Sequence, residues 1–349
     1  MNNKRRGSLP TFIWPIALVM AMLAILLLAV PEPPRAEAPV PPQLYSSSFQ
    51  LIATGNRLGT YYPVGSILSK WINSQLGSEG VFKPIETNGS IDNVRLVTQG
   101  KAFLAMAESR IIKENLAENA SSPLRLVWPL WNDVVHILRA PERFDPGDTF
   151  PGRSNVFLGQ INSSTRRTSL EIIEAMGQYR RKTSVEIPPE AVLTSLANGH
   201  IGYAAIQAGM PNRTVSDAVL FHECSLVSLS ADEIEKVVAK VSTARPVTIP
   251  AGFYGDTQLE VQTIGLPNML IASVDTSEEA VGLVIESMLK GAAHLKLHHQ
   301  AFGNIPVDPA LALSIMQEVG VAVHPGTLNW IAKNSAAKQA SSQGAVADE

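Results

Sequence analysis

The amino-acid sequence predicts an α/β protein with a mostly parallel sheet and helices on both faces of that sheet. From Phe49 onward, short apolar segments alternate with segments of helical spacing, as parallel strands joined by helices do. The chain has 349 residues, 45% hydrophobic and 17% charged, which is enough for one large two-lobed body or two ordinary domains. Residues 124–140 are apolar and rich in β-branched side chains, as expected of a strand that crosses between two lobes.

Each predicted element has a local signal, such as the helical spacing of apolar side chains within residues 60–76. The predicted strands are residues 49–54, 81–87, 101–108, 124–140, 155–160, 201–207, 223–229, 257–265 and 268–274. The predicted helices are residues 60–76, 90–100, 165–177, 188–199, 231–241 and 277–295.

The amino-terminal residues have the pattern of a membrane anchor. Residues 11–30 carry no charge and have about the length that spans a hydrocarbon core roughly 30 Å thick. Basic residues precede them, which favours a cytoplasmic basic stub at residues 1–10. The alternative is a cleaved signal peptide, but the apolar run is long for one, and the small-residue site at residues 36–38 lies well downstream. We therefore expect an uncleaved transmembrane anchor in a bacterial inner membrane.

Composition also marks the segments on either side of the folded body. Residues 31–48 are rich in proline, which fixes φ and removes amide donors, so we expect an extended linker there. Residues 333–349 are small and polar, and we expect a flexible tail. The folded body between them would then lie in the periplasm or outside the cell.

Composition and motifs argue against several functions. The net charge of −3 offers no broad basic face for nucleic acid, and the single Cys224 can form neither an internal disulfide nor a Cys-rich metal site. His294 and His298 are four residues apart, but the glutamate of H-E-x-x-H is absent, so a solvated helix face is expected. Ser163 and Ser164 have no G-x-S-x-G turn, and no phosphate-binding glycine motif is complete. We expect no catalysis, no metal and no cofactor.

Four loops share one design, in which an apolar strand ends in small polar residues and a helix follows. Helix amino termini carry unpaired N–H groups and partial positive charge, so they bind carboxylates, and they gather at the carboxyl ends of parallel strands. The alternative is ordinary capping of each helix, by Thr60, Ser90 and Thr165. Recurrence of the design favours a binding cleft. The loops are residues 54–62, 87–90, 108–110 and 160–166.

Five short motifs occur in a fixed order between about Phe49 and Ala332. They are GTYYPVG at residues 59–65, TNGSIDN at 87–93, SSTR at 163–166, IPAGFY at 249–254 and HPG at 324–326. In combination they resemble the motifs of the TAXI family of TRAP-transporter solute receptors, which are extracytoplasmic solute-binding proteins.

The resemblance implies a type II periplasmic-binding-protein fold, with two lobes joined by a two-strand hinge. Lobe I would comprise residues 49–136 plus 247–332, and lobe II would comprise residues 137–246. The crossings near residues 134–137 and 246–248 would absorb the closing rotation. The resemblance also implies delivery of a small carboxylate, such as glutamate or a dicarboxylate, to a TRAP permease driven by an ion gradient.

The loops and the resemblance together indicate where the ligand would bind, with Arg57 or Arg166 meeting a ligand carboxylate. The expected ligand-binding residues are Arg57, Gly59, Thr60, Tyr61, Tyr62, Thr87, Asn88, Gly89, Ser90, Ser109, Ser163, Ser164, Thr165, Arg166, Gln207 and Tyr254. The sequence departs from the family at Arg57, Arg110 and Ser164, which stand where glycine or aspartate is usual. The alternative function is a tethered sensor or scaffold that has the same fold and signals to a membrane partner.

Overall fold

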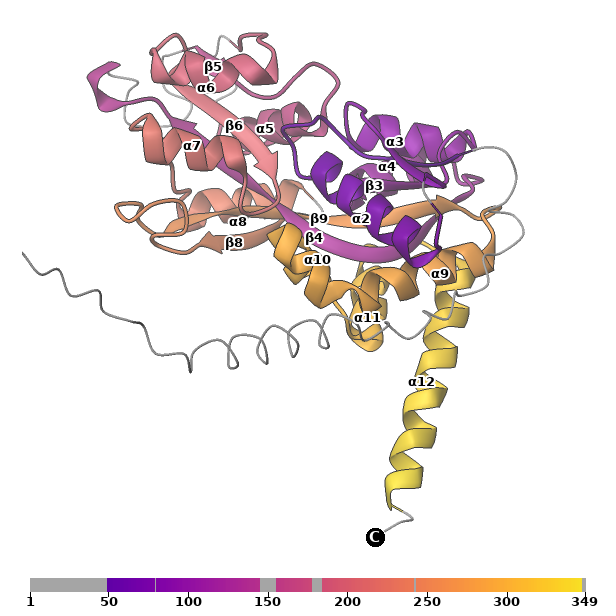
Figure 1. The fold of residues 1–349 in the computed structure, drawn as a ribbon. Helices are drawn as coiled ribbons and strands as arrows, with labels where there is room; N and C mark the ends of the chain where they lie inside the picture. The colour runs from indigo at the N-terminus through magenta and orange to yellow at the C-terminus, as the bar shows by residue number, and fades with distance from the viewer. Residues whose placement is uncertain (1–48, 79, 145–154, 178–183, 242, 347–349) are drawn as a thin grey trace, which may run out of the picture. The chain divides into compact units, whose positions relative to one another are not determined.

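The computed structural model describes a single α/β body built around one mixed sheet (Figure 1). The strands are β1 (Gln50–Ala53), β2 (Phe82–Ile85), β3 (Leu104–Glu108), β4 (Leu124–Arg139), β5 (Val156–Phe157), β6 (Tyr203–Ala208), β7 (Ser225–Leu226), β8 (Arg245–Ile249) and β9 (Val261–Ser273). The helices are α2 (Tyr61–Gln75), α3 (Ser90–Thr98), α4 (Ser109–Glu118), α5 (Ser164–Ala175), α6 (Pro189–Ala197), α7 (Arg213–Phe221), α8 (Ala231–Lys240), α9 (Glu278–Lys290), α10 (Ala292–His298), α11 (Pro309–Val319) and α12 (Pro325–Val346), with 3-10 turns η2 (Glu142–Phe144) and η4 (Gln300–Asn304).

The described residues are 49–78, 80–144, 155–177, 184–241 and 243–346, with the side chains described as far as residue 335. The predicted cytoplasmic stub (1–10), membrane anchor (11–30) and proline-rich linker (31–48) lie outside them. Within the described part of the chain, no helix combines the length and the apolar character that crossing a membrane requires.

The sheet is mixed rather than mostly parallel, which corrects the sequence prediction. Its strands follow the order β2-β1-β3-β9-β4-β6-β5, with β7 paired to β4 and β8 paired to β9. The parallel pairs are β1 with β2, β1 with β3, and β5 with β6. Every pair that includes β4 or β9 is antiparallel. The local pattern identified the strands, but the direction of β4 and β9 depends on the path of the chain between distant segments.

The two long strands β4 and β9 lie side by side and run through the whole body (Figure 1). The sequence predicted β4 as one crossing strand, and this is confirmed. It predicted two strands at residues 257–265 and 268–274, whereas β9 continues through Pro267. The pairing register shifts between Pro129 and Asn132, and Asn132 stands opposite Pro267. Because proline has no N–H to donate, the ladder is interrupted at this point.

We name the first lobe the group of elements around one end of β4 and β9, which comprises β1, β2, β3, α2, α3, α4, α9, α10 and α11. Alternate residues of its strands face opposite sides of the sheet, since side chains alternate along a strand. Ile52 and Met106 pack under α2 and α9, whereas Ala53 and Ala107 pack under α3, α4 and α11. The first lobe therefore has a hydrophobic core on each face of the sheet.

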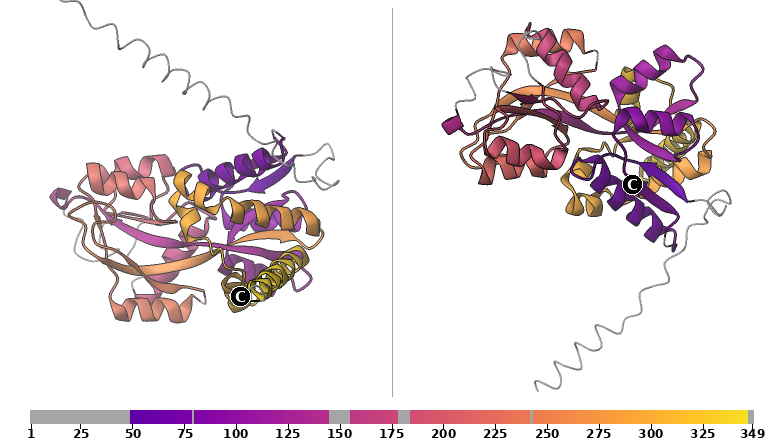
Figure 2. Two further views of the ribbon diagram at one scale, coloured as in Figure 1. Left: turned by 60° about the horizontal axis from the view of Figure 1, so that its bottom comes forward. Right: turned by 90° about the horizontal axis from the view of Figure 1, so that it is seen from above.

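The second lobe lies around the other end of β4 and β9, and Figure 2 shows the two groups from two further sides. Its cores also divide by alternation, with Val135 packed against α5 and α8, and Val134 packed against α6 and α7. Tyr254 and Ile264 pack in these same cores. The chain therefore enters the second lobe earlier along β4, and leaves it later along β9, than the expected crossings at residues 134–137 and 246–248.

The sequence predicts a flexible tail at residues 333–349, and in the structure residues 333–346 belong to the helix α12. The helix α12 continues to Val346, because the segment after Trp330 is rich in alanine, lysine and glutamine, which are good helix formers. Trp330 packs edge-on against Trp128 of β4, with 5.7 Å between the ring centroids. This contact holds the first turns of α12 against the first lobe.

Candidate functional site

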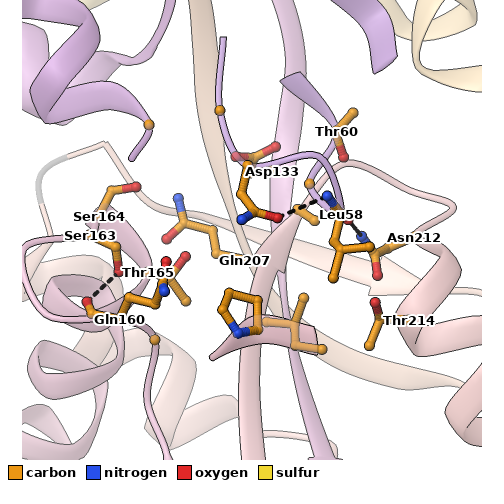
Figure 3. A pocket seen from close by; sticks show the side chains of 18 of the residues that line it. Leu58, Thr60, Asp133, Gln160, Ser163, Ser164, Thr165, Gln207, Asn212 and Thr214 are labelled. Carbon is orange, nitrogen blue, oxygen red and sulfur yellow. Dashed lines mark hydrogen bonds between the residues drawn. The ribbon is translucent and has the colours of Figure 1, made fainter. Parts of the chain in front are cut away.

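A cavity of about 170 Å³ lies where loops of the first lobe meet loops and strands of the second (Figure 3). Its first-lobe wall comes from the segments that lead into α2 and α3, and its second-lobe wall comes from the start of α5, from β6 and from the start of α7. The lining residues are Gly55, Asn56, Leu58, Gly59, Thr60, Tyr61, Asn88, Gly89, Asp133, Phe157, Gly159, Gln160, Ser163, Ser164, Thr165, Pro189, Val192, Ala205, Ile206, Gln207, Ala208, Asn212 and Thr214.

The first-lobe wall contains two helix amino termini that no side chain caps. Thr60 precedes α2 and Gly89 precedes α3, and neither position provides a capping hydrogen bond. The Thr60 hydroxyl instead accepts from the Gly209 amide of the second lobe at 2.9 Å. Ordinary capping, which was the alternative interpretation of these loops, is therefore absent at both helices. Their first-turn amides have donor capacity left for a ligand oxygen.

In the second-lobe wall, the backbone at Gly159 passes close to the backbone of the first turn of α5. The Ser163 hydroxyl caps this helix by accepting from the Arg166 amide at 3.1 Å, and it donates to the Gln160 carbonyl at 2.8 Å. Gly159 has φ of +100°, and a Cβ there would lie 2.5 Å from the Arg166 nitrogen. Only glycine fits this position without displacing the wall.

Asp133 of β4 is the acidic residue that lines the cavity, and it is 6% exposed. The Trp131 indole donates to its Oδ1 at 2.9 Å. Burial, aided by the nearby charge of Glu108, raises the pKa of Asp133 to about 7. None of the described lining residues is lysine, arginine or histidine. The cavity therefore contains a carboxyl group without a cationic side chain on its walls.

Behind the cavity, a buried ionic cluster joins the two lobes. Arg110 of α4 donates to Glu108 Oε1 at 2.9 Å and to Thr168 Oγ1 at 2.8 Å, and it also pairs with Glu171 of α5. Arg110 is 4% exposed and Glu108 is fully buried. The Gln207 amide donates to Glu108 Oε2 at 2.7 Å, which links the cluster to the cavity wall. The positive charge of this arginine is thus already shared between two carboxylates.

Nine of the predicted ligand-binding residues line the cavity together: Gly59, Thr60, Tyr61, Asn88, Gly89, Ser163, Ser164, Thr165 and Gln207. Three others support its wall or lie deeper. Thr87 Oγ1 donates to Asn93 Oδ1 at 2.7 Å, Ser90 Oγ accepts from the Glu108 amide at 3.0 Å, and Ser109 is fully buried. Thr87 and Ser90 therefore hold the loops in place, and none of the three residues lines the cavity.

The two arginines expected to meet a ligand carboxylate lie outside the cavity lining and are paired with glutamates. Arg57 forms an ion pair with Glu86 at 2.9 Å, with its guanidinium over the Tyr62 ring. Arg166 forms an ion pair with Glu186 at 2.5 Å. Arg57 does line a second hollow, of about 490 Å³, which shares part of its wall with the cavity. The sequence identified the loops that carry these arginines, but it could not show their glutamate partners.

Tyr254, also predicted to bind the ligand, is buried behind the second-lobe wall. Its hydroxyl lies 2.8 Å from His136 Nε2 and accepts from the Asn212 amide at 3.2 Å. Burial lowers the pKa of His136 to about 4, so the imidazole is neutral at neutral pH. Tyr254 therefore supports Asn212, which lines the cavity.

Several lining residues were missed from the sequence, among them Asn56, Asp133, Asn212 and Thr214. Asp133 had a visible signal, because it is the one carboxylate in a largely apolar crossing strand, and buried carboxylates are rare without a role. Among the residues that the structure describes, no three His, Cys, Asp or Glu side chains gather as a metal site would require.

Both the sequence and the fold of this chain are similar to those of known proteins. Residues 52–330 match the NMT1-like family. MatC from Rhodopseudomonas palustris, solved with bound malate, is similar over 82% of this chain and 99% of its own, with 14% identity and a TM-score of 0.52. The alkanesulfonate-binding protein SsuA from Xanthomonas axonopodis pv. citri, bound to MOPS, is similar over 80% of this chain and 85% of its own, with 13% identity and a TM-score of 0.44. The likeness to MatC shows an α/β fold of the periplasmic-binding-protein kind.

Proposed function

Since the chain belongs to the NMT1-like family, we propose that it is an extracytoplasmic receptor that binds a small organic solute between its lobes and delivers it to a membrane transporter. The observation that carries the proposal is a cavity whose walls come from both lobes. A ligand that contacts both walls stabilises the closed arrangement relative to an open one, and a membrane partner can recognise that difference.

Contacts between the two lobes support a closing mechanism. Thr60 accepts from Gly209, and Arg110 of the first lobe reaches Thr168 of the second. The interrupted ladder between Pro129 and Pro267 lies where β4 and β9 pass from one lobe to the other. We propose that this interruption is the hinge about which the lobes rotate.

The proposed ligand is a small organic acid, either an amino acid such as glutamate or a dicarboxylate. The uncapped amino termini of α2 and α3 support this class, because their free amides can hold carboxylate oxygens without an arginine. The proposed partner is a TRAP-type permease driven by an ion gradient, as the resemblance in the loop motifs implies. We propose further that the ligand leaves chemically unchanged. Ser163 supports this last point, because its hydroxyl is engaged by backbone groups rather than by a general base.

The proposed topology is a single-pass anchor at residues 11–30, with the folded body outside the cytoplasm. Membrane fractionation and amino-terminal sequencing of the protein from its host test it. Retention of residues 1–30 in the membrane fraction is the expected result, and a mature start near Gln43 would refute the anchor.

Calorimetry, small-angle scattering and mass spectrometry of the full chain in detergent test the receptor role. We expect one small organic acid to bind, the radius of gyration of the body to fall, and the recovered ligand to keep its mass. Absence of binding by every amino acid and dicarboxylate tested would overturn the receptor proposal. A converted ligand would show an enzyme instead.

A further inference from the structure

Asp133 is the feature of the cavity that the proposed receptor role leaves unexplained. It projects from the middle of β4 among the lining side chains, near Gln207 (Figure 3). The hydrogen bond from Trp131 occupies one site on Oδ1. An ionised carboxylate offers about four acceptor sites, so Asp133 keeps acceptor capacity toward a bound molecule.

The charges near Asp133 do not balance it. The charge of Glu108 raises the pKa of Asp133 further, and Arg110, the cation paired with Glu108, is shared with Glu171. Among the described lining residues there is no basic side chain. Burying a carboxylate without a cation or a full set of donors is unfavourable, and burial accordingly raises the pKa of Asp133.

Tyr61 of α2 is a titratable group near Asp133, and the Asp133 charge helps to raise the pKa of Tyr61. Its hydroxyl lies 2.5 Å from Asn268 Oδ1 and donates to that oxygen. The Tyr61 proton is therefore already used and does not neutralise Asp133. Asn268 and Gln207 lie beside the carboxylate and give it partial, uncharged support.

We infer that Asp133 determines specificity by accepting hydrogen bonds from an ammonium group of the ligand, so that the site prefers amines to dicarboxylates of matched length. The inference deepens the proposed receptor function and rests on it. An ammonium group supplies the missing cation and up to three donors to a buried acceptor. A second ligand carboxylate at the same place would face the Asp133 carboxylate with no basic side chain among the described lining residues, which is repulsive at close range in a partly desolvated site.

Calorimetric titration of the full chain in detergent with matched compounds tests the inference at pH 7.5. The pairs are β-alanine with succinate, 4-aminobutyrate with glutarate, and L-glutamate with 2-hydroxyglutarate, the last of which replaces ammonium by hydroxyl. We expect the ammonium member of at least one pair to bind tenfold or more tightly than its partner. Quenching or shift of tryptophan fluorescence on binding provides a second readout, because Trp131 donates directly to Asp133.

The variant Asp133→Asn keeps an oxygen that can accept from Trp131, so the fold is expected to persist. It should reduce the preference for the ammonium member to threefold or less. The matched control is Asp232→Asn on α8, whose carboxylate is exposed and pairs with Lys236; it should leave the preference unchanged.

Several outcomes would overturn the inference. Tighter binding of succinate, glutarate or 2-hydroxyglutarate than of the matched amine would refute the role of Asp133 while leaving the receptor function intact. The same holds if Asp133→Asn keeps the wild-type preference. If no compound of either kind binds, the receptor proposal fails for these small acids, and the inference that rests on it fails with it.

Discussion

Replacing Arg110 with methionine removes a guanidinium that joins the two lobes from within. Methionine keeps the aliphatic stem, so the main change is the loss of the charge and its donors. Those donors serve Glu108 at 2.9 Å, Thr168 at 2.8 Å and Glu171. The substitution therefore leaves a fully buried Glu108 without its cation.

The expected magnitude follows from the burial of the pair. Removing one member of a buried ion pair costs about 3–5 kcal/mol, because the remaining charge stays desolvated. Arg167 is the matched control: it is 47% exposed and pairs with Glu114, also between α5 and α4. Exposed pairs of this kind contribute only about 0.2–1 kcal/mol, so Arg167→Met should have little effect.

Urea unfolding followed by circular dichroism measures the difference in free energy of unfolding between each variant and the wild type. Adding Glu108→Gln to Arg110→Met should restore about 1–3 kcal/mol, because a neutral amide removes the uncompensated charge. Two results would refute the view that Glu108 depends on Arg110: a loss of unfolding free energy below about 1 kcal/mol for Arg110→Met, or a double variant that is less stable than Arg110→Met alone.

Three further predictions concern the cavity. Burial raises the pKa of Asp133 from 3.8 to about 7, so its contribution to stability is full below pH 3.8 and is lost as the pH rises to about 7. The urea midpoint of Asp133→Asn should therefore equal that of the wild type near pH 4 and exceed it at pH 8. Thr60→Val leaves the Gly209 amide without its acceptor and should lower the free energy of unfolding by about 1–3 kcal/mol, whereas Thr60→Ser should not. Gly159→Ala should weaken ligand binding in calorimetry about tenfold or more, because its Cβ would push against the first turn of α5. A Cβ at Gly177 meets nothing within 4 Å, so Gly177→Ala should retain affinity. Equal affinities for the two variants would contradict this account.

Much of the fold could be predicted because its signals are local. Apolar periodicity located β4 and the helices α2, α5 and α8 within a few residues of their observed bounds. The loops before α2, α3 and α5 were identified because small polar residues and glycine follow each strand. The loops before α2 and α3 meet at the cavity because β1 and β2 are parallel neighbours, so that their carboxyl ends lie at one edge of the sheet.

The remaining features depend on contacts between residues far apart in the chain. The partners of Arg57 and Arg166 are Glu86 and Glu186, and no periodicity in the sequence shows which carboxylate a surface arginine will meet. The position of Asp133 in the cavity likewise depends on where β4 passes between the lobes, which is determined by its antiparallel pairing with β9. The sequence by itself determined the α/β class of the fold, the positions of many of its strands and helices and the loops that line the cavity, because these follow from backbone preference and local hydrophobic pattern. Only the tertiary structure decided strand direction, lobe boundaries and the charge of the cavity, because each depends on which distant segments pack together.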